Sequence, residues 1–139
     1  MSAESENVEI LKNAYAEWGD KKAADLGCWT CLMADDIKMR SLASGARGAE
    51  FTQARSGKAQ AIAYLEELTR DWKMNSYVVD EYIAQGDRVV AVGSTSWTNK
   101  KTGKTASTPK VDIWRMRNGQ AVEFAEFYDT AALFAAAQP

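Results

Sequence analysis

The stretch Pro109–Asp129, PKVDIWRMRNGQAVEFAEFYD, decides the fold of this chain, because its pattern predicts a hydrophobic β-hairpin. Aromatic and β-branched residues fill both halves, and the dipeptide Asn118-Gly119 between them is typical of a hairpin turn. Two acidic residues, Asp112 and Glu126, lie among these apolar neighbours. The hairpin therefore also indicates where chemistry would take place.

Side chains alternate between the two faces of a strand, so each half of the hairpin sets its acid beside apolar residues. A carboxyl group buried in such surroundings needs a partner or a proton. If it is buried alone its pKa rises, and it can exchange protons near neutral pH. We therefore predict Asp112 and Glu126 as a catalytic acid and base in a pocket. At the rim of the sheet, the alternative, both would simply be solvated.

The turn decides whether the two acids share a face. A two-residue loop at Asn118-Gly119 would put Glu126 on the face opposite to Asp112. A three-residue loop that includes Arg117 would leave both acids on one face. We favour the three-residue loop, because it sets apolar side chains opposite one another and puts glycine where a type I turn with a bulge needs it.

Lys110 shares a face with Asp112, since the two residues are two positions apart on one strand. It could pair with either acid, and the cluster would then be a structural ion pair. Three aromatic residues on the same faces are expected to contact a ligand: Trp114, Phe124 and Tyr128. Tyr15, on the first predicted helix, is a further candidate as a pocket donor, with packing in the helix stripe as the alternative. The other tryptophans are expected in the core.

Length and composition predict a single globular domain over residues 1–139, with 46% hydrophobic and 26% charged residues. A net charge of −2 gives no general attraction to nucleic acid. No apolar run approaches membrane-spanning length, and the opening residues, MSAESENVEI, are too polar for a secretory signal. We therefore expect a cytoplasmic protein with neither nucleic acid nor a membrane as its partner.

Histidine is absent, which excludes a Ser-His-Asp triad and a His-based metal site. Cys28 and Cys31 have the C-x-x-C spacing, but two cysteines alone cannot complete a zinc site. Because they fall inside a predicted helix, we favour two small buried thiols over a redox pair. No metal and no cofactor are expected.

Apolar periodicity predicts three helices, a first strand between the second and third, and then four further strands. The helices are expected at residues 6–18, 21–33 and 60–72, the strands at 37–42, 76–84, 88–98, 105–116 and 121–128, and a short last helix at 131–137. Gly93 suggests a bend or bulge in its strand. The glycine-rich segment 43–58 is expected to be a lid or a plain surface loop.

This order of elements predicts an α+β fold, in which a curved antiparallel sheet wraps around three helices and forms a cone with an internal pocket. The outer face of the hairpin carries apolar residues that would be exposed in a monomer: Val111, Ile113, Ala125 and Phe127. A contiguous patch of this kind usually marks an interface. We therefore expect a homodimer formed through the outer face of the sheet.

Four short motifs punctuate the chain: Trp18-Gly19-Asp20, Ala34-Asp35-Asp36, Gly57-Lys58 and Phe127-Tyr128-Asp129. With the order of elements, they resemble the nuclear-transport-factor-2-like fold in its SnoaL-like branch, over residues 7–134. Ketosteroid isomerase, polyketide cyclases and limonene epoxide hydrolase belong to that branch. The resemblance implies a single SnoaL-like domain, a cone-shaped fold and a dimer, but one fold hosts many chemistries.

The resemblance also implies a role for each acid. Residues 109–112 match the segment that carries a protonated, oxygen-binding aspartate in ketosteroid isomerases, so Asp112 looks like that acid. The base of those isomerases falls at Ser41, which cannot replace it. Glu126 matches a catalytic acid of epoxide hydrolases, whose Arg-x-Asp partner is absent around residues 95–97.

The functional prediction is therefore a protein that binds a small, largely apolar molecule in the cone. Acid/base catalysis of the isomerase, cyclase or hydratase type would use the two carboxyl groups. The alternative is a non-catalytic dimeric module for ligand binding or interaction, so the sequence leaves open whether the chain is an enzyme.

Overall fold

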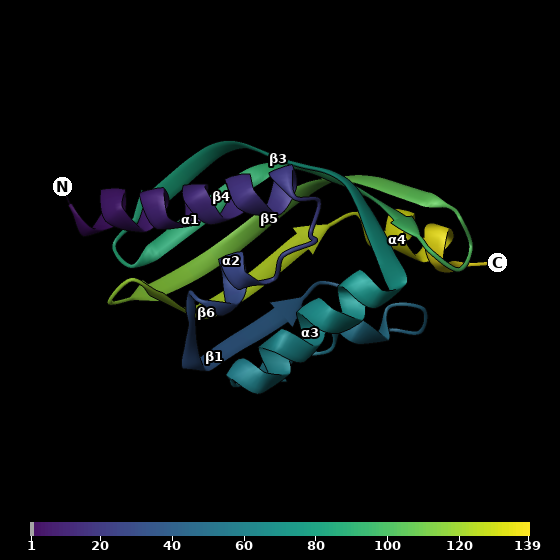
Figure 1. Cartoon of the computed structure of the whole chain (residues 1–139), viewed down its shortest axis with the longest axis horizontal. Coiled ribbons are helices and arrows are strands. Elements are labelled where there is room, and N and C mark those ends of the chain that lie inside the picture. The colour runs from purple at the N-terminus through teal and green to yellow at the C-terminus, as the bar shows by residue number, and fades with distance from the viewer. Residues whose placement is uncertain (1) are drawn as a thin grey trace.

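A curved six-stranded sheet forms the framework of the computed structural model, which describes residues 2–139 (Figure 1). The strands follow the order β2-β1-β6-β5-β4-β3 across the sheet. Their bounds are β1 Met33–Ser41, β2 Arg55–Ser56, β3 Trp72–Gln85, β4 Arg88–Asn99, β5 Thr105–Arg117 and β6 Gln120–Tyr128. β1 runs parallel to β6, and every other neighbouring pair is antiparallel. The predicted α+β cone is confirmed, with this one parallel pair added.

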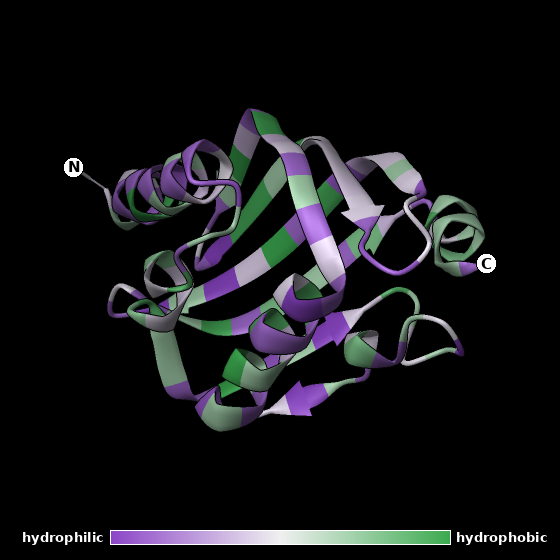
Figure 2. Ribbon diagram, turned by 45° about the vertical axis from the view of Figure 1, so that its right-hand side comes forward, coloured by the Kyte–Doolittle hydropathy of each residue, from purple (hydrophilic) through white to green (hydrophobic). Residues whose placement is uncertain are grey.

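Helices α1 and α3 cover the concave side of the sheet, α1 next to β3 and α3 next to β1 (Figure 1). The helical bounds are α1 Ala3–Asp20, α2 Gly27–Thr30, the short 3-10 helix η1 Glu50–Thr52, α3 Lys58–Asp71 and α4 Thr130–Ala137. Ser2 caps α1, because its hydroxyl accepts a hydrogen bond from the backbone N–H of Ser5 at 3.1 Å. Hydrophobic colour in Figure 2 gathers on the strands and helix faces that enclose the interior.

The helix predicted over residues 21–33 is wrong. Lys22 and Ala23 adopt left-handed backbone angles, with φ of 49° and 64°, which stop helical hydrogen bonding after α1. Only the single turn α2 remains, and β1 already begins at Met33. The Asp25 carboxylate accepts a hydrogen bond from the N–H of Gly27 at 2.8 Å and so fixes the start of that turn. Tertiary context overrode the apolar periodicity here.

The predicted three-residue hairpin loop is also wrong. Asn118 and Gly119, with φ of 52° and 78°, form the two-residue turn between β5 and β6. One extra residue on β6, Val122, then shifts the register by one position. As a result Asp112 lies directly opposite Glu126. The two acids share a face as expected, but a bulge in the strand puts them there and not the length of the loop.

The bulge predicted in the strand of Gly93 lies instead on the neighbouring strand β3, beside the residue that pairs with Gly93. The register of β3 against β4 shifts between Val79 and Glu81. A Cβ at Gly93 would stand 1.8 Å from the carbonyl oxygen of Val78, so only glycine lets the two backbones approach this closely. Bulges increase the local twist, and this one helps the sheet to curve around the helices.

The remaining elements lie within a few residues of their predicted ranges, as is usual for element ends. The segment 43–58 is a loop that contains η1 and the two-residue strand β2. Within residues 2–139, no helix combines the length and the apolar character needed to cross a membrane.

The outer face of the sheet carries a row of apolar residues that runs across four strands. Cross-strand pairing sets Ile83 beside Val90, Val90 beside Ile113, and Ile113 beside Ala125. Ile83 is 53% exposed and Val78, on the same strand, is 50% exposed. Val90 and Ile113 are half-buried, and the predicted exposure of Ala125 is wrong, since it is buried within the chain itself. The exposed part of the row therefore lies on β3, and a second copy of the chain would cover it.

We expect a homodimer through this face, with a dimer mass in light scattering at micromolar concentration. Ile113→Glu places a charge at the centre of the row and should shift the mass towards the monomer, while the melting temperature of the monomer unit stays nearly unchanged. Ser107→Glu, at an exposed position of the same strand, is the matched control and should remain dimeric. A monomeric wild type would contradict the prediction.

Candidate functional site

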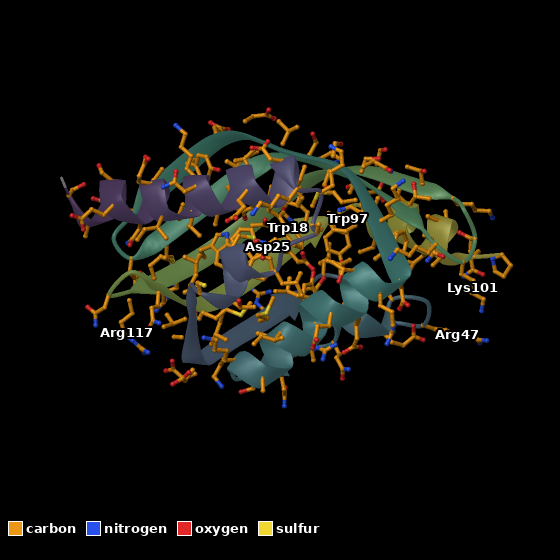
Figure 3. All side chains as sticks on the ribbon, viewed as in Figure 1. Trp18, Asp25, Arg47, Trp97, Lys101 and Arg117 are labelled. Atoms are coloured by element: carbon orange, nitrogen blue, oxygen red, sulfur yellow. The ribbon has the colours of Figure 1, made fainter. Side chains whose placement is uncertain are left out.

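A pocket of about 100 Å³ lies between the concave face of the sheet and helices α1, α2 and α3. All five tryptophans of the chain line it: Trp18, Trp29, Trp72, Trp97 and Trp114. In Figure 3 the labelled Trp18 and Trp97 point inward, whereas Arg47, Lys101 and Arg117 point away from the molecule. The four tryptophans other than Trp114 therefore belong to the core, as predicted, and all five form the wall of a cavity. A cavity of comparable size accommodates a molecule such as benzene.

The six residues predicted for the site all line this one pocket: Tyr15, Asp112, Trp114, Phe124, Glu126 and Tyr128. Asp112 is 1% exposed and Glu126 is 5% exposed, so neither carboxyl group is solvated at the rim. The hairpin register places them opposite each other on β5 and β6. The geometry brings the predicted residues together, and their catalytic and binding roles stay predictions.

Lys110 lies between the two acids. Its Nζ atom is 2.8 Å from Oδ1 of Asp112 and 3.0 Å from Oε1 of Glu126. Burial alone would lower the pKa of Lys110, but the two neighbouring carboxylates outweigh it and hold this pKa well above its usual value. Lys110 is therefore a cation at neutral pH, which makes it a stabiliser of negative charge and not an amine nucleophile.

Three tyrosine hydroxyls complete the hydrogen bonding of the acids. Tyr15 and Tyr77 both donate to Oδ2 of Asp112, the latter at 2.6 Å. Tyr64, from α3, donates to Oε2 of Glu126 at 2.5 Å. Burial first, and then the nearby carboxylates, raise the pKa of all three tyrosines well above its usual value. They are therefore neutral donors over the physiological range.

The two acids differ in how far their acceptor capacity is used. Asp112 accepts hydrogen bonds from Tyr15, Tyr77 and Lys110, whereas Glu126 accepts one only from Tyr64 and forms an ion pair with Lys110. A carboxylate offers about four lone-pair positions. Glu126 thus retains more capacity to accept a hydrogen bond or a proton from a ligand, and Asp112 is held by protein groups alone.

Tyr64 and Tyr77 are the residues of the cluster that sequence reasoning missed. The predicted apolar stripe of α3 passed over Tyr64, although it lies on the buried side of the helix beside Leu65 and Leu68. Tyr77 follows a register shift between Met74 and Ser76, which changes the face that it occupies. Tyr64 lies one helical turn before Leu68 of the stripe, and this spacing was the sequence signal that could have identified it. The bulge left no such signal for Tyr77.

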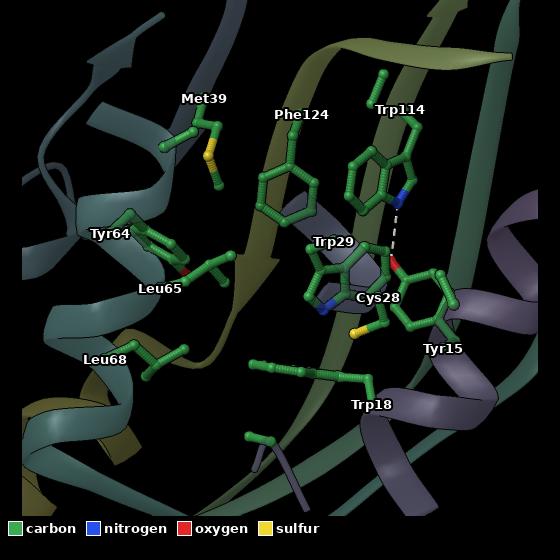
Figure 4. Close-up of a cluster of buried hydrophobic side chains, with 14 of the residues drawn as sticks. Tyr15, Trp18, Cys28, Trp29, Met39, Tyr64, Leu65, Leu68, Trp114 and Phe124 are labelled. Carbon is green, nitrogen blue, oxygen red and sulfur yellow. Dashed lines mark hydrogen bonds between the residues drawn. The ribbon is translucent and has the colours of Figure 1, made fainter. Parts of the chain in front are cut away.

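Stacked aromatic rings hold the wall of the pocket in place (Figure 4). The ring centroids of Trp29 and Trp114 are 5.2 Å apart at an interplanar angle of 16°, and Phe124 packs 4.5 Å from Trp114. The indole N–H of Trp114 donates to the hydroxyl of Tyr15 at 2.8 Å. The aromatic wall is therefore continuous with the hydrogen-bonded cluster.

The loop of residues 43–58 contributes to the pocket through Phe51 of η1, whose ring packs 5.7 Å from that of Tyr64. Tyr128 anchors the beginning of the loop, because its hydroxyl contacts Oγ of Ser41 at 2.5 Å and accepts from the N–H of Ala43 at 3.4 Å. The loop covers one side of the pocket, which is more than a plain surface excursion. The Ser41 hydroxyl is thus engaged by Tyr128.

No group of three or more potential metal ligands occurs in the part of the chain that the structure describes. The prediction of two buried thiols is correct for Cys28 but wrong for Cys31, which is exposed. Burial, reinforced by Glu17 and Asp25, raises the pKa of the Cys28 thiol to about 12, so that thiol stays protonated. This agrees with a structural role for Cys28.

The sequence profile of the SnoaL-like domain matches residues 12–124. The chain belongs to this family. No curated protein matches it in sequence.

Solved structures share the fold along nearly the whole chain. An NTF2-like protein from Burkholderia xenovorans is 24% identical, with a TM-score of 0.79 and 98% of both chains covered. A protein from Jannaschia that is described as a SnoaL-like polyketide cyclase is 23% identical, with a TM-score of 0.74 over 100% of this chain and 97% of that one. TerC, co-crystallised with polyporic acid, is 23% identical, with a TM-score of 0.75 over 96% and 99%. At these identities the likeness concerns the fold.

Removing the cation should destabilise the protein in a pH-dependent way. Lys110→Met leaves two buried carboxylates without a counter-ion, which we expect to cost about 3 kcal/mol of the free energy of unfolding near neutral pH. Because protonation of a carboxylate relieves that repulsion, acidification should reduce the difference in melting temperature between the variant and the wild type. Lys100→Met, at an exposed lysine, is the control. A variant as stable as the wild type at all pH values would contradict the ion-pair geometry.

The tyrosines provide a second pH test. Tyr82 and Tyr128 have a pKa of about 12, raised by burial, and the pKa values of the other three are raised further. Since unfolded tyrosine has a pKa of about 10, the neutral phenols favour the fold below that pH, and this contribution declines as the pH rises above it. Tyrosinate absorbance should thus appear only together with unfolding, detected by circular dichroism. Ionisation of several tyrosines in the folded protein near pH 10 would contradict it.

Proposed function

We propose that this protein binds a small, largely apolar organic molecule in the pocket and acts on it by acid/base chemistry of the isomerase, cyclase or hydratase type. One observation carries the proposal. The cluster of Lys110, Asp112 and Glu126 forms the polar part of a cavity whose remaining wall is aromatic and aliphatic. Apolar pockets with a few convergent polar groups are typical of small-molecule sites.

In this proposal Glu126 is the base, because it has the freer acceptor positions. It would remove a proton from the carbon beside a ligand carbonyl or from a hydroxyl group, and would become neutral. Its hold on Lys110 would then weaken, and the Lys110 ammonium would stabilise the negative oxygen formed on the ligand. The Glu126 carboxyl would then return a proton, exchanged with solvent water, to another atom of the ligand and so complete an isomerisation.

Asp112 supports this chemistry by holding Lys110 in place. Its carboxylate accepts from Tyr15 and Tyr77 and pairs with Lys110, so it fixes the position and the charge of the lysine. The low exposure of the whole cluster strengthens these interactions, because few water molecules screen them. The names of similar folds, among them a polyketide cyclase by description and a complex with polyporic acid, support a small organic ligand by analogy of fold alone.

A non-catalytic binding module is the second candidate, and one observation favours it. The Nζ atom of Lys110 already lies within 3.0 Å of three protein oxygens, with hydrogen bonds to Tyr77 and Asp112 and an ion pair with Glu126. The network is complete before any ligand arrives, which suits a structural core as well as a preorganised site. Turnover, not binding, separates the two candidates.

Paired carboxyl variants test the assignment of roles. Glu126→Gln should abolish turnover, retain ligand binding and cost about 1 kcal/mol of stability, since Lys110 keeps Asp112 as its counter-ion. Asp112→Asn removes an acceptor of three hydrogen bonds and should cost about 3 kcal/mol, with a smaller effect on turnover per folded molecule. Ligands would be found by quenching of tryptophan fluorescence with phenols, monocyclic terpenoids and aromatic ketones, and turnover by solvent deuterium incorporation.

Each outcome bears on a different part of the proposal. Binding without deuterium incorporation in the wild type would leave the binding module. Full turnover in Glu126→Gln would overturn the assignment of the base. Absence of binding by every compound class would overturn the pocket as a ligand site.

A further inference from the structure

Trp29 is held rigidly beside the polar cluster. It lies on the single-turn helix α2, and three aromatic rings fix its orientation. Its ring stacks on Trp114 and meets the ring of Tyr15 edge-on at a centroid distance of 4.9 Å and an angle of 79°. Trp18 contacts it at 6.0 Å in a second edge-on arrangement. A side chain packed in this way cannot turn its indole nitrogen to another direction without moving its neighbours.

The indole N–H of Trp29 has no partner among residues 2–139, although the residue is only 5% exposed. Two other tryptophans of the pocket wall have internal partners: Trp97 donates to Thr95 at 2.7 Å, and Trp114 donates to Tyr15. Buried indole N–H groups usually find an acceptor, so an unpaired one calls for an explanation. The indole nitrogen of Trp29 is not fully enclosed by protein atoms, so it borders open space.

That space is the pocket. Trp29 lines the cavity, and in Figure 4 its nitrogen points towards the side where Leu65 and Leu68 of α3 lie. Trp18 and Trp72 also lack an internal partner, but Trp29 alone among these three stacks on Trp114 and touches Tyr15, the residues that lead to Asp112. A ligand that reaches the acids would therefore pass next to the indole N–H of Trp29.

We propose that the indole N–H of Trp29 donates a hydrogen bond to a carbonyl oxygen of the ligand and so selects carbonyl compounds over hydrocarbons of the same shape. This inference rests on the proposed function. The ligand class is a small aromatic ketone, because the neighbouring surface is aromatic and the cavity of about 100 Å³ suits a single ring. Indole is a donor only, so a ligand group without an acceptor gains nothing at this position.

Two compounds of equal shape provide the probe. Acetophenone carries the carbonyl group, and α-methylstyrene replaces its oxygen with a methylene group. In nitrogen-15 NMR spectra, the indole N–H signal of Trp29 should move downfield with acetophenone and much less with α-methylstyrene. The signals of Trp97 and Trp114, whose N–H groups already have acceptors, should change little with either compound. This measurement uses the unaltered protein.

A variant gives the energetic test. Trp29→Phe keeps a planar ring but removes the donor, and should weaken acetophenone binding by about tenfold while changing the affinity for α-methylstyrene by less than about twofold. Trp72→Phe is the matched control, because it also shortens a tryptophan of the pocket wall. We expect it to change the two affinities by the same factor. Calorimetry would measure binding, and thermal unfolding would confirm that both variants fold.

The results separate this inference from the proposal that it rests on. If acetophenone binds and the Trp29 signal stays in place, or if Trp29→Phe weakens both compounds equally, the role of Trp29 is overturned and the pocket remains a ligand site. If neither compound binds the wild type at millimolar concentration, the ligand class and the role of Trp29 both fail.

Discussion

The buried ammonium group of Lys110 is the interaction on which the rest of the site depends. Asp112 and Glu126 lie side by side in a largely apolar interior, where two like charges without a counter-ion would strongly destabilise the fold. Lys110, within 3.0 Å of both carboxylates, offsets that cost. The hydroxyl groups of Tyr15, Tyr64 and Tyr77 then donate hydrogen bonds to the remaining oxygens of these carboxylates.

In this protein the strand register determines which charged groups meet in the site. Without the extra residue at Val122, Glu126 would project from the outer face of the sheet and Lys110 would pair with Asp112 alone. The bulge thus creates the pair of acids as well as the twist of the hairpin. The aromatic wall completes the arrangement, because tryptophans from α1, α2 and three positions on the strands exclude water from the charged cluster. Core and site are built from the same residues.

Local patterns predicted most of the fold. The amphipathic stripe of α1, the alternation on β5 and β6 and the capping Asp129 before α4 are signals that lie within a few residues of one another. The failures arose where distant contacts decide the backbone. Residues 21–33 have a helical pattern, yet the chain turns at Lys22 and Ala23 to reach the sheet. Likewise, the two-residue turn at Asn118-Gly119 needed the bulge at Val122 to serve the site, and no local signal marks that bulge.

The sequence by itself determined the class of fold, the absence of histidine chemistry and the two acids set among apolar residues, because composition and periodicity carry that information. Only the tertiary structure decided that Lys110 bridges the acids, that Tyr64 and Tyr77 donate to them, and that the indole N–H of Trp29 faces the pocket. These contacts join α1, α2, α3, β3, β5 and β6, elements far apart along the chain. Their geometry follows from strand register and helix packing, which single-sequence patterns do not encode.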